Sequence, residues 1–537
     1  MRRAERGGGF ARRARGARRA LQGIAAAMAV AAGTGGAWAG DPVADTGGGR
    51  LFAPSLDAAP AASAPAIEPR LPAAAVRLAQ AGARGTDAKA SGGESLSKDD
   101  LFGTKSDAKA AGEGLSKDDL FGTAGDAKPK PGVRFSGFVD GLGAYTYAQP
   151  THWSRAVGRL QVVAQGELSE AVKWKAGGRV DADLVYLGSD FYLDDVRRDQ
   201  RASAFWSENY IDFSAGALDF RIGAQQIVWG EVVGLFFADV VSARDTREFL
   251  LPSFDIIRIP QWAARAEYFA GDSHVEVVWI PVPAFDRIGK PGSDFYPAPL
   301  PSPTSPQVAA LFADPDTPSR SLANSNAGIR ANTLVAGWDV AAFYYRSYST
   351  APTFYRVPSA TPGQPFTYQP RYDRIWQAGG TVTKDFGDVV LRGEAVYADG
   401  LGYSVTGLAT PDGVVQRSTL DYILSVEFQP MDDTRVNLQA FQRVFYGGSV
   451  DDLVVKSDGF GASLLVSTKL NAAFEPQLLW LQSFKDGGGL VRPRLNWYPA
   501  KNTTVGFGVD IFTGSSDGFF GRYNNRDRAY SEVRYDF

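Results

Sequence analysis

Segments with two unlike faces follow one another along residues 133–537, and each is close to the ~9–11 residues that a strand needs to cross a membrane. The clearest segment alternates two sets of side chains, which are Lys173, Lys175, Arg179, Asp181 and Asp183 on one face and Trp174, Ala176, Val180, Leu184 and Tyr186 on the other. Because successive side chains of a strand point to opposite faces, this two-residue period predicts strands that lie between an apolar and a polar environment.

The connections between these segments alternate between short and long. Short ones occur at residues 168–170, 270–272, 386–388, 431–433 and 500–502. This strict alternation is typical of an outer-membrane barrel, and no apolar run reaches the ~18 residues of a membrane helix. We therefore predict an all-β fold, a transmembrane antiparallel β-barrel of about 18 strands over residues 132–537, with 16 strands as the alternative. The predicted location is the outer membrane of a Gram-negative bacterium.

The first residues have the features of a secretory signal peptide. Eight arginines form a basic region, residues 21–33 are apolar, and Ala37-Trp38-Ala39 fits an A-x-A cleavage site, so residues 1–39 are predicted to be removed. Their removal leaves 48 basic and 58 acidic residues, a net charge of −10. An acidic protein is a poor candidate for nucleic acid, and we expect no such partner.

Residues 40–131 are predicted to form a disordered arm in the periplasm, because they are rich in Ala, Gly, Pro and Ser and carry few large apolar side chains. The nine-residue sequence LSKDDLFGT occurs in it twice, at residues 96–104 and 115–123. Two hypotheses remain open for the repeat: a duplicated spacer, or a docking motif for a periplasmic partner. The docking hypothesis assigns partner binding to Leu101, Phe102, Leu120 and Phe121.

The chain contains no cysteine and only two histidines. Disulfides, a thiol nucleophile and cysteine metal sites are therefore excluded, and a histidine metal cluster is not expected. We predict no metal, no cofactor and no catalytic residues.

A connection of roughly thirty residues separates two of the two-faced segments, which is far longer than a hairpin needs. It begins at Trp229-Gly230-Glu231 and mixes charged and aromatic residues, a composition that favours folding into a polar lumen rather than a dry core. We predict that it forms the constriction loop of a pore, with its polar groups against wall residues such as Arg221 and Glu267. The candidate pore residues are Arg221, Gln225, Glu231, Asp239, Arg244, Asp245, Arg247, Arg265, Glu267, Arg435, Arg492 and Arg494.

Charges of both signs are assigned to the lumen face of the wall. They include Arg159, Arg179, Arg346, Arg392, Arg443, Glu276, Glu394, Glu427 and Glu475 besides the candidates above. Cross-strand pairs of opposite charge can stiffen a wall without selecting a solute, and this explanation covers most of them. The alternative is an anionic track along Arg492 and Arg494, or Arg435 and Arg443. Aromatic side chains in the long loops fit either solute capture or an interfacial girdle.

The motif Arg221-Ile222-Gly223-x-Gln225-Gln226-x-Val228-Trp229-Gly230-Glu231 resembles a large proteobacterial family of outer-membrane proteins known only as a domain of unknown function. The resemblance extends through Asp239-Val240-Val241-Ser242-Ala243-Arg244-Asp245 and the Asp-Leu-Phe-Gly motif of the arm. It implies a porin-like barrel that works beside an inner-membrane exporter or a periplasmic lipid-carrier-like protein. Transport of lipids or other hydrophobic molecules is also implied. The last segment, which ends on Phe537, resembles the signal read by the barrel-assembly machinery.

The leading functional hypothesis is a channel narrowed by the long connection. A second is a conduit for hydrophobic molecules that docks a carrier through its arm. A third is an outer-membrane hydrolase that uses His274 with Ser273 or Ser463, although no recognised spacing supports it. A purely structural barrel is the fourth.

Overall fold

The computed structural model describes residues 132–537 except 233, 235–236, 298–305, 361 and 486. The predictions for the signal peptide, the arm and its four docking residues Leu101, Phe102, Leu120 and Phe121 lie outside the described residues.

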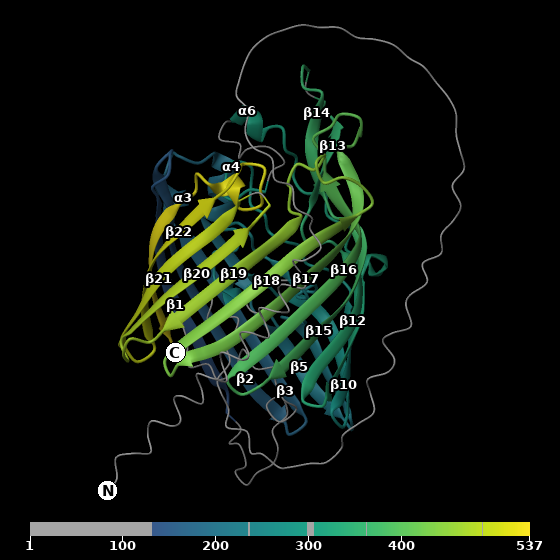
Figure 1. Cartoon of the computed structure of the whole chain (residues 1–537), viewed down its shortest axis with the longest axis vertical. Coiled ribbons are helices and arrows are strands. Elements are labelled where there is room, and N and C mark those ends of the chain that lie inside the picture. The colour runs from purple at the N-terminus through teal and green to yellow at the C-terminus, as the bar shows by residue number, and fades with distance from the viewer. Residues whose placement is uncertain (1–131, 233, 235–236, 298–305, 361, 486) are drawn as a thin grey trace, which may run out of the picture. The chain divides into compact units, whose positions relative to one another are not determined.

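Nineteen strands form one antiparallel sheet that closes on itself, because its first strand, β1, pairs with its last, β23 (Figure 1). β4 and β5 both pair with β3 and act as one wall strand, so the barrel has eighteen. The predicted fold and strand number are confirmed. The wall consists of β1 (Arg134–Thr146), β2 (His152–Ser169), β3 (Val172–Asp183), β4 (Ala202–Trp206), β5 (Asn209–Ala215), β6 (Leu218–Gln225), β9 (Gln261–Ala270), β10 (Ser273–Ile280), β11 (Asn326–Val335), β12 (Trp338–Tyr348), β15 (Arg374–Asp385), β16 (Val389–Ser404), β17 (Val414–Met431), β18 (Thr434–Tyr446), β19 (Gly459–Thr468), β20 (Phe474–Ser483), β21 (Gly489–Ala500), β22 (Thr503–Thr513) and β23 (Arg528–Asp536).

Shorter elements lie in the connections. They are the strand pairs β7 (Ala243–Arg244) with β8 (Arg258–Ile259) and β13 (Thr353–Pro358) with β14 (Phe366–Arg371), the helices α3 (Leu184–Gly188), α4 (Asp194–Gln200), α5 (Phe254–Ile257) and α6 (Pro306–Ala309), and the 3-10 turns η2 (Leu322–Asn324) and η3 (Gly521–Tyr523). α3, α4, α6, β13 and β14 gather at one end of the barrel, while the C-terminus lies at the other (Figure 1). Within the described part of the chain, the helices are too short and too polar to cross a membrane.

The wall alternates as the sequence predicts. In β6, Ile222 is 51% exposed on the outer face while its neighbour Arg221 is buried on the inner face. In β9, which pairs with β6, Trp262 is exposed outward and Gln261 is buried inward. Exposed apolar side chains outside and buried polar ones inside are the arrangement of a barrel that meets lipid. Arg346 is an exception to the predicted lumen set, because it lies on the exposed face of β12 beside Tyr344.

Connections at the C-terminal end of the barrel are all tight turns of two to five residues. At the opposite end they are mostly long, but residues 147–151 and 484–488 are only five residues each. The strict alternation that the sequence predicts is therefore wrong at these two places. A five-residue loop is enough there because the strands that it joins are hydrogen-bonded neighbours.

One wall strand is interrupted between β4 and β5. The side-chain amide of Asn209 replaces the missing ladder bonds, since it donates to the carbonyl oxygen of Gly177 at 2.9 Å and accepts from the Gly177 N–H at 3.0 Å. A bulge that satisfies its backbone in this way bends the strand without opening the wall.

Candidate constriction site

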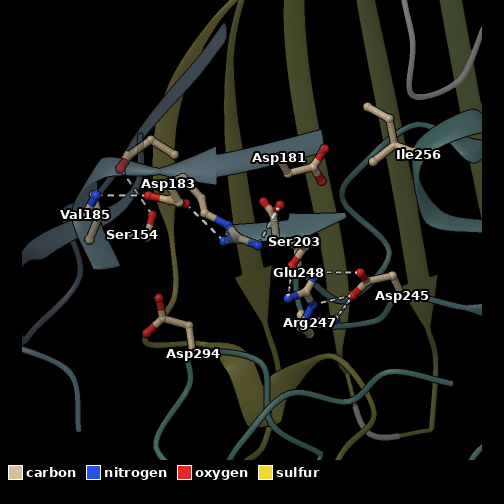
Figure 2. Close-up of polar contacts among 12 residues, drawn as sticks. Ser154, Asp181, Asp183, Val185, Ser203, Asp245, Arg247, Glu248, Ile256 and Asp294 are labelled. Atoms are coloured by element: carbon tan, nitrogen blue, oxygen red, sulfur yellow. Dashed lines mark hydrogen bonds and ion pairs between the residues drawn. The ribbon is translucent and has the colours of Figure 1, made fainter. Parts of the chain in front are cut away.

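The connection of residues 226–260 between β6 and β9 lies inside the barrel, where Glu248 binds the wall. The Glu248 carboxylate accepts from Arg155 at 2.9 Å and from Arg159 at 3.3 Å, both on the inner face of β2. Its second oxygen accepts from Arg528 of β23 at 3.2 Å. Figure 2 draws Glu248 with Arg247 of the connection and residues of β3. Three guanidinium groups thus hold one carboxylate of the connection.

Glu394 of β16 holds the beginning of the same connection. Its carboxylate accepts the backbone N–H groups of Val232 at 2.6 Å and Ala238 at 2.9 Å, and also that of Glu231. In the ring of eighteen strands, β16 lies nine positions from β2 in either direction. The connection is therefore anchored on opposite walls and crosses the lumen.

Further polar contacts surround the start of the connection. The Trp229 indole N–H donates to Glu276 of β10 at 2.8 Å, and Arg330 of β11 donates to Glu231 at 3.0 Å. Trp229 is only 1% exposed. The Trp-Gly-Glu triplet thus attaches to the inner wall through two separate contacts.

Two apolar clusters also hold the connection in the lumen. Trp229 and Val241 pack with Phe343 of β12 and Val396 of β16. A second cluster joins the connection to the inner faces of β19–β22 and contains Phe249, Leu251, Phe254, Ile257, Leu465, Leu479, Leu481, Leu490 and Phe512. The sequence predicts only polar surroundings for the connection, and part of it packs in apolar clusters instead. The sequence signal was the run Leu478-Leu479-Trp480-Leu481, which makes both faces of β20 apolar.

Five of the candidate pore residues lie in the connection itself. Arg247 forms a two-pronged ion pair with Asp245, at 2.6 and 2.8 Å. Asp239 accepts from Arg258 at 3.3 Å, and Arg244 donates to the Asp239 carbonyl at 2.7 Å. With Glu231, these residues are brought together inside the barrel. Whether they control conduction stays a prediction.

Four arginines among the wall candidates form ion pairs with carboxylates of the wall. The structure shows ion pairs between Arg221 and Asp212, Arg265 and Glu267, Arg492 and Asp510, and Arg494 and Glu532. Gln225 donates to the Ala263 carbonyl, and Arg435 lies on β18 near its turn. The predicted partners Arg221 and Glu267 are thus wrong for the connection. Arg155, Arg159, Arg528, Glu276 and Glu394 take that role, together with Arg330 and with Arg534 of β23, which donates to Asp255 at 3.0 Å. Of these, Arg155 and Arg528 were missed because they sit at strand ends, and Arg330 and Arg534 were missed as well.

Glu248 and Asp245 are held as carboxylates. Burial alone would raise the pKa of Glu248, but Arg155, Arg528 and Arg159 hold it far below its ordinary value of 4.5. Burial would likewise raise the pKa of Asp245, but Arg247 keeps it below its usual range. The anchor of the connection is therefore charged at any ordinary pH.

Acid should release the connection only below pH 4.5. A carboxyl group whose folded pKa is depressed contributes stability above its unfolded pKa and loses it as pH falls toward the folded value. With an ordinary value of 4.5 for Glu248, we expect constant single-channel conductance from pH 8 to about 5 and a rise only at lower pH. A conductance step between pH 6 and 7 would contradict this assignment.

Replacing Glu394 by alanine should loosen the connection without disturbing the barrel. The substitution leaves three backbone N–H groups without their acceptor, which lowers the stability of the docked segment by about 2–4 kcal/mol. We expect faster proteolysis between residues 226 and 260 while the barrel keeps its heat-modifiable migration. Glu427→Ala is the control, because Glu427 is equally buried on β17 but pairs with Arg392 of the wall. Equal cleavage of the two variants would refute the anchor.

The residues of the hydrolase hypothesis are not assembled. Ser463 of β19 donates to Gln439, and His274 of β10 stacks on Phe269. Ser273 shares a hydrogen bond with Thr333 of β11. β10 and β19 are separated by six other wall strands, which keeps His274 and Ser463 apart. Among the described residues, there is no group of three or more acidic, histidine or cysteine residues suited to hold a metal ion.

The fold and this site define a porin-type barrel with an inward-folded connection. Residues 167–537 match the family described as "Protein of unknown function (DUF1302)", and the chain belongs to that family. No curated protein matches the sequence.

Several solved structures are similar to the chain at low identity. OccK1 (OpdK) of Pseudomonas aeruginosa is 10% identical over 75% of this chain and 98% of its own, with a TM-score of 0.44. OpdK with vanillate gives the same identity and coverage with a TM-score of 0.45. Salmonella typhi OmpF in complex with daunomycin is 11% identical over 76% of this chain and 98% of its own, with a TM-score of 0.38.

Proposed function

We propose that this protein is an outer-membrane channel whose lumen is narrowed by residues 226–260. The observation that carries the proposal is the attachment of this connection to opposite walls, by Glu248 at β2 and by Glu394 at β16. A segment that crosses a barrel of this size restricts passage more than the vestibules beside it. Solutes would pass through the space that the connection leaves along the wall.

The outer face of the wall supports a position in a lipid bilayer. Exposed apolar side chains include Trp153, Trp206, Ile222, Trp262, Trp279 and Trp497. Such a band matches the lipid-facing surface and aromatic girdles of outer-membrane barrels. In this arrangement the tight turns and the C-terminus face the periplasm, where the arm would meet an inner-membrane exporter or a periplasmic carrier.

The C-terminal residue supports assembly as a closed barrel. The backbone N–H of Phe537 donates to the Gly137 carbonyl at 2.9 Å, and the Gly137 N–H donates to the Phe537 carbonyl at 2.8 Å. Phe537 therefore extends the seam between β23 and β1, and we propose that the barrel-assembly machinery reads this last strand.

The direct test is conduction by the purified protein in a planar bilayer. We expect small, uniform single-channel steps from correctly assembled protein and none from protein that has been boiled. Absence of steps from both the intact protein and a variant that lacks the connection would overturn the channel proposal, since the second should conduct if the barrel can conduct at all.

A further inference from the structure

A cavity of about 570 Å³ lies between the connection and the inner faces of β16–β19. Its lining comes from the connection, from the ends of the wall strands nearest the long loops, and from the long loops themselves. The volume falls within the ~300–1,000 Å³ typical of ligand pockets. The cavity is thus large enough to hold a small molecule in the half of the barrel that faces away from the tight turns.

Aromatic rings from separate segments converge on this cavity. Phe237 of the connection and Phe441 of β18 lie with their ring centroids 6.0 Å apart. Phe249 of the connection contacts Tyr523 at 5.0 Å and Phe519 at 5.4 Å. Rings presented from several directions offer faces and edges on which another ring can stack. The lining therefore favours a solute that contains rings.

Gly461 of β19 makes room for one of these rings. A Cβ atom at this position would come within 2.4 Å of the Phe441 side chain. The same atom would lie 2.7 Å from the Gln482 carbonyl oxygen, so a larger residue at this position would displace the ring or the backbone.

Two of the cations that line the cavity are paired with carboxylates. Arg443 and Asp421 form a two-pronged pair at 2.6 and 2.8 Å. Lys456 pairs with Asp517 at 3.3 Å. An anionic ligand would have to compete with these carboxylates for Arg443 and Lys456. The pairing of these two cations favours a neutral solute.

We propose that this cavity is a binding site for neutral, ring-bearing apolar molecules, which enter from the long-loop end. The proposal deepens the channel function and rests on it for transport, but binding can be measured separately.

The test uses the full chain in lipid nanodiscs with N-phenyl-1-naphthylamine as a fluorescent neutral probe, and empty nanodiscs as the background. We expect saturable binding that weakens about tenfold in Phe441→Ala and in Phe237→Ala, because each removes a ring from the lining. Phe460→Ala is the matched control, since Phe460 lies on the neighbouring strand but is 48% exposed on the outer face. It should bind as the wild type does.

One further probe and two competing ligands test the chemical class. The sulfonated analogue 1-anilinonaphthalene-8-sulfonate should bind about tenfold more weakly than the neutral probe, because Arg443 and Lys456 are paired with carboxylates. Equal or tighter binding of the sulfonate would overturn the neutral class. Displacement of the probe by oleate at lower concentration than by naphthalene would overturn the ring class.

The outcomes separate this site from the channel function. If the protein conducts but shows no saturable binding, or if both phenylalanine variants bind the probe as the wild type does, the binding site is contradicted and the channel function stands. If the protein binds the probe saturably but never conducts, the binding site stands and the channel function is contradicted. Heat-modifiable migration identifies correctly assembled variants, and the two alanine variants provide independent readings if one of them fails to assemble.

Discussion

Replacing residues 227–259 by a four-residue turn is expected to raise single-channel conductance severalfold. Gln225 of β6 lies directly opposite Gln261 of β9, so a tight turn can join the two strands without moving either. The wall arginines that bound Glu248 would then be solvated by the water that fills the lumen. Discrimination between small and large solutes should fall at the same time, since the narrowest part of the path is removed.

The measurement compares this variant with the intact protein in the same bilayer. Heat-modifiable migration of both proteins is the control for assembly. An assembled variant with the conductance of the intact protein would show that the connection does not limit flow.

The second large effect is expected for Glu248→Gln, which removes the charge that three arginines share. Breaking a buried ion pair by removing one partner costs about 3–5 kcal/mol. The connection should therefore loosen at β2 and β23. Each of the three arginines keeps a second carboxylate partner, which is Asp183, Asp140 or Asp510, but the loss of one negative charge beside them should favour anions. We expect higher conductance together with a reversal potential shifted toward anion selectivity under a salt gradient.

Glu427→Gln separates these two consequences. Glu427 pairs with Arg392 on the wall, at 2.6 Å, so its loss adds positive charge to the lumen without releasing the connection. This control should change selectivity but not conductance. Unchanged conductance and selectivity in Glu248→Gln would count against the anchor.

The strands could be predicted from the sequence because lipid and water impose a period of two residues on the wall. Ile222 and Arg221 show it in adjacent positions, and Trp262 and Gln261 repeat it on the next strand. The closed ring of eighteen strands followed from counting such segments. Arg346 escaped the rule because it lies on the outer face near the long-loop end, where a guanidinium group can reach polar surroundings.

The contacts across the lumen could not be predicted in the same way. Glu248 meets Arg155, and Glu394 meets Val232, only after β2 and β16 are placed opposite each other by closure of the sheet. The residues next to Glu248 and Glu394 in the sequence do not indicate which wall strand lies across the lumen. Sequence alone indicates contacts with the strands that flank the connection, and it therefore predicts Arg221 of β6 and Glu267 of β9 as partners.

Ion pairs within the wall weaken the case for an anionic track along the arginines. Each arginine of the track forms an ion pair with a carboxylate. The pairs are Arg492 with Asp510, Arg494 with Glu532, and Arg443 with Asp421. These pairs lower the net charge that a passing anion would meet. A selective role for these arginines stays a prediction, as does the function of the repeat in the arm.

The most direct measurement of the central claim is a cross-link between the connection and the wall in the assembled barrel. The chain contains no cysteine, so Phe237→Cys with Phe441→Cys introduces a unique pair at positions whose rings lie 6.0 Å apart. If residues 226–260 cross the lumen, a short bismaleimide should join the two cysteines in isolated outer membranes, and proteolysis between the two positions should then leave the fragments linked. If each single cysteine reacts with a maleimide but the pair does not cross-link, the connection lies elsewhere and the channel is not narrowed by it.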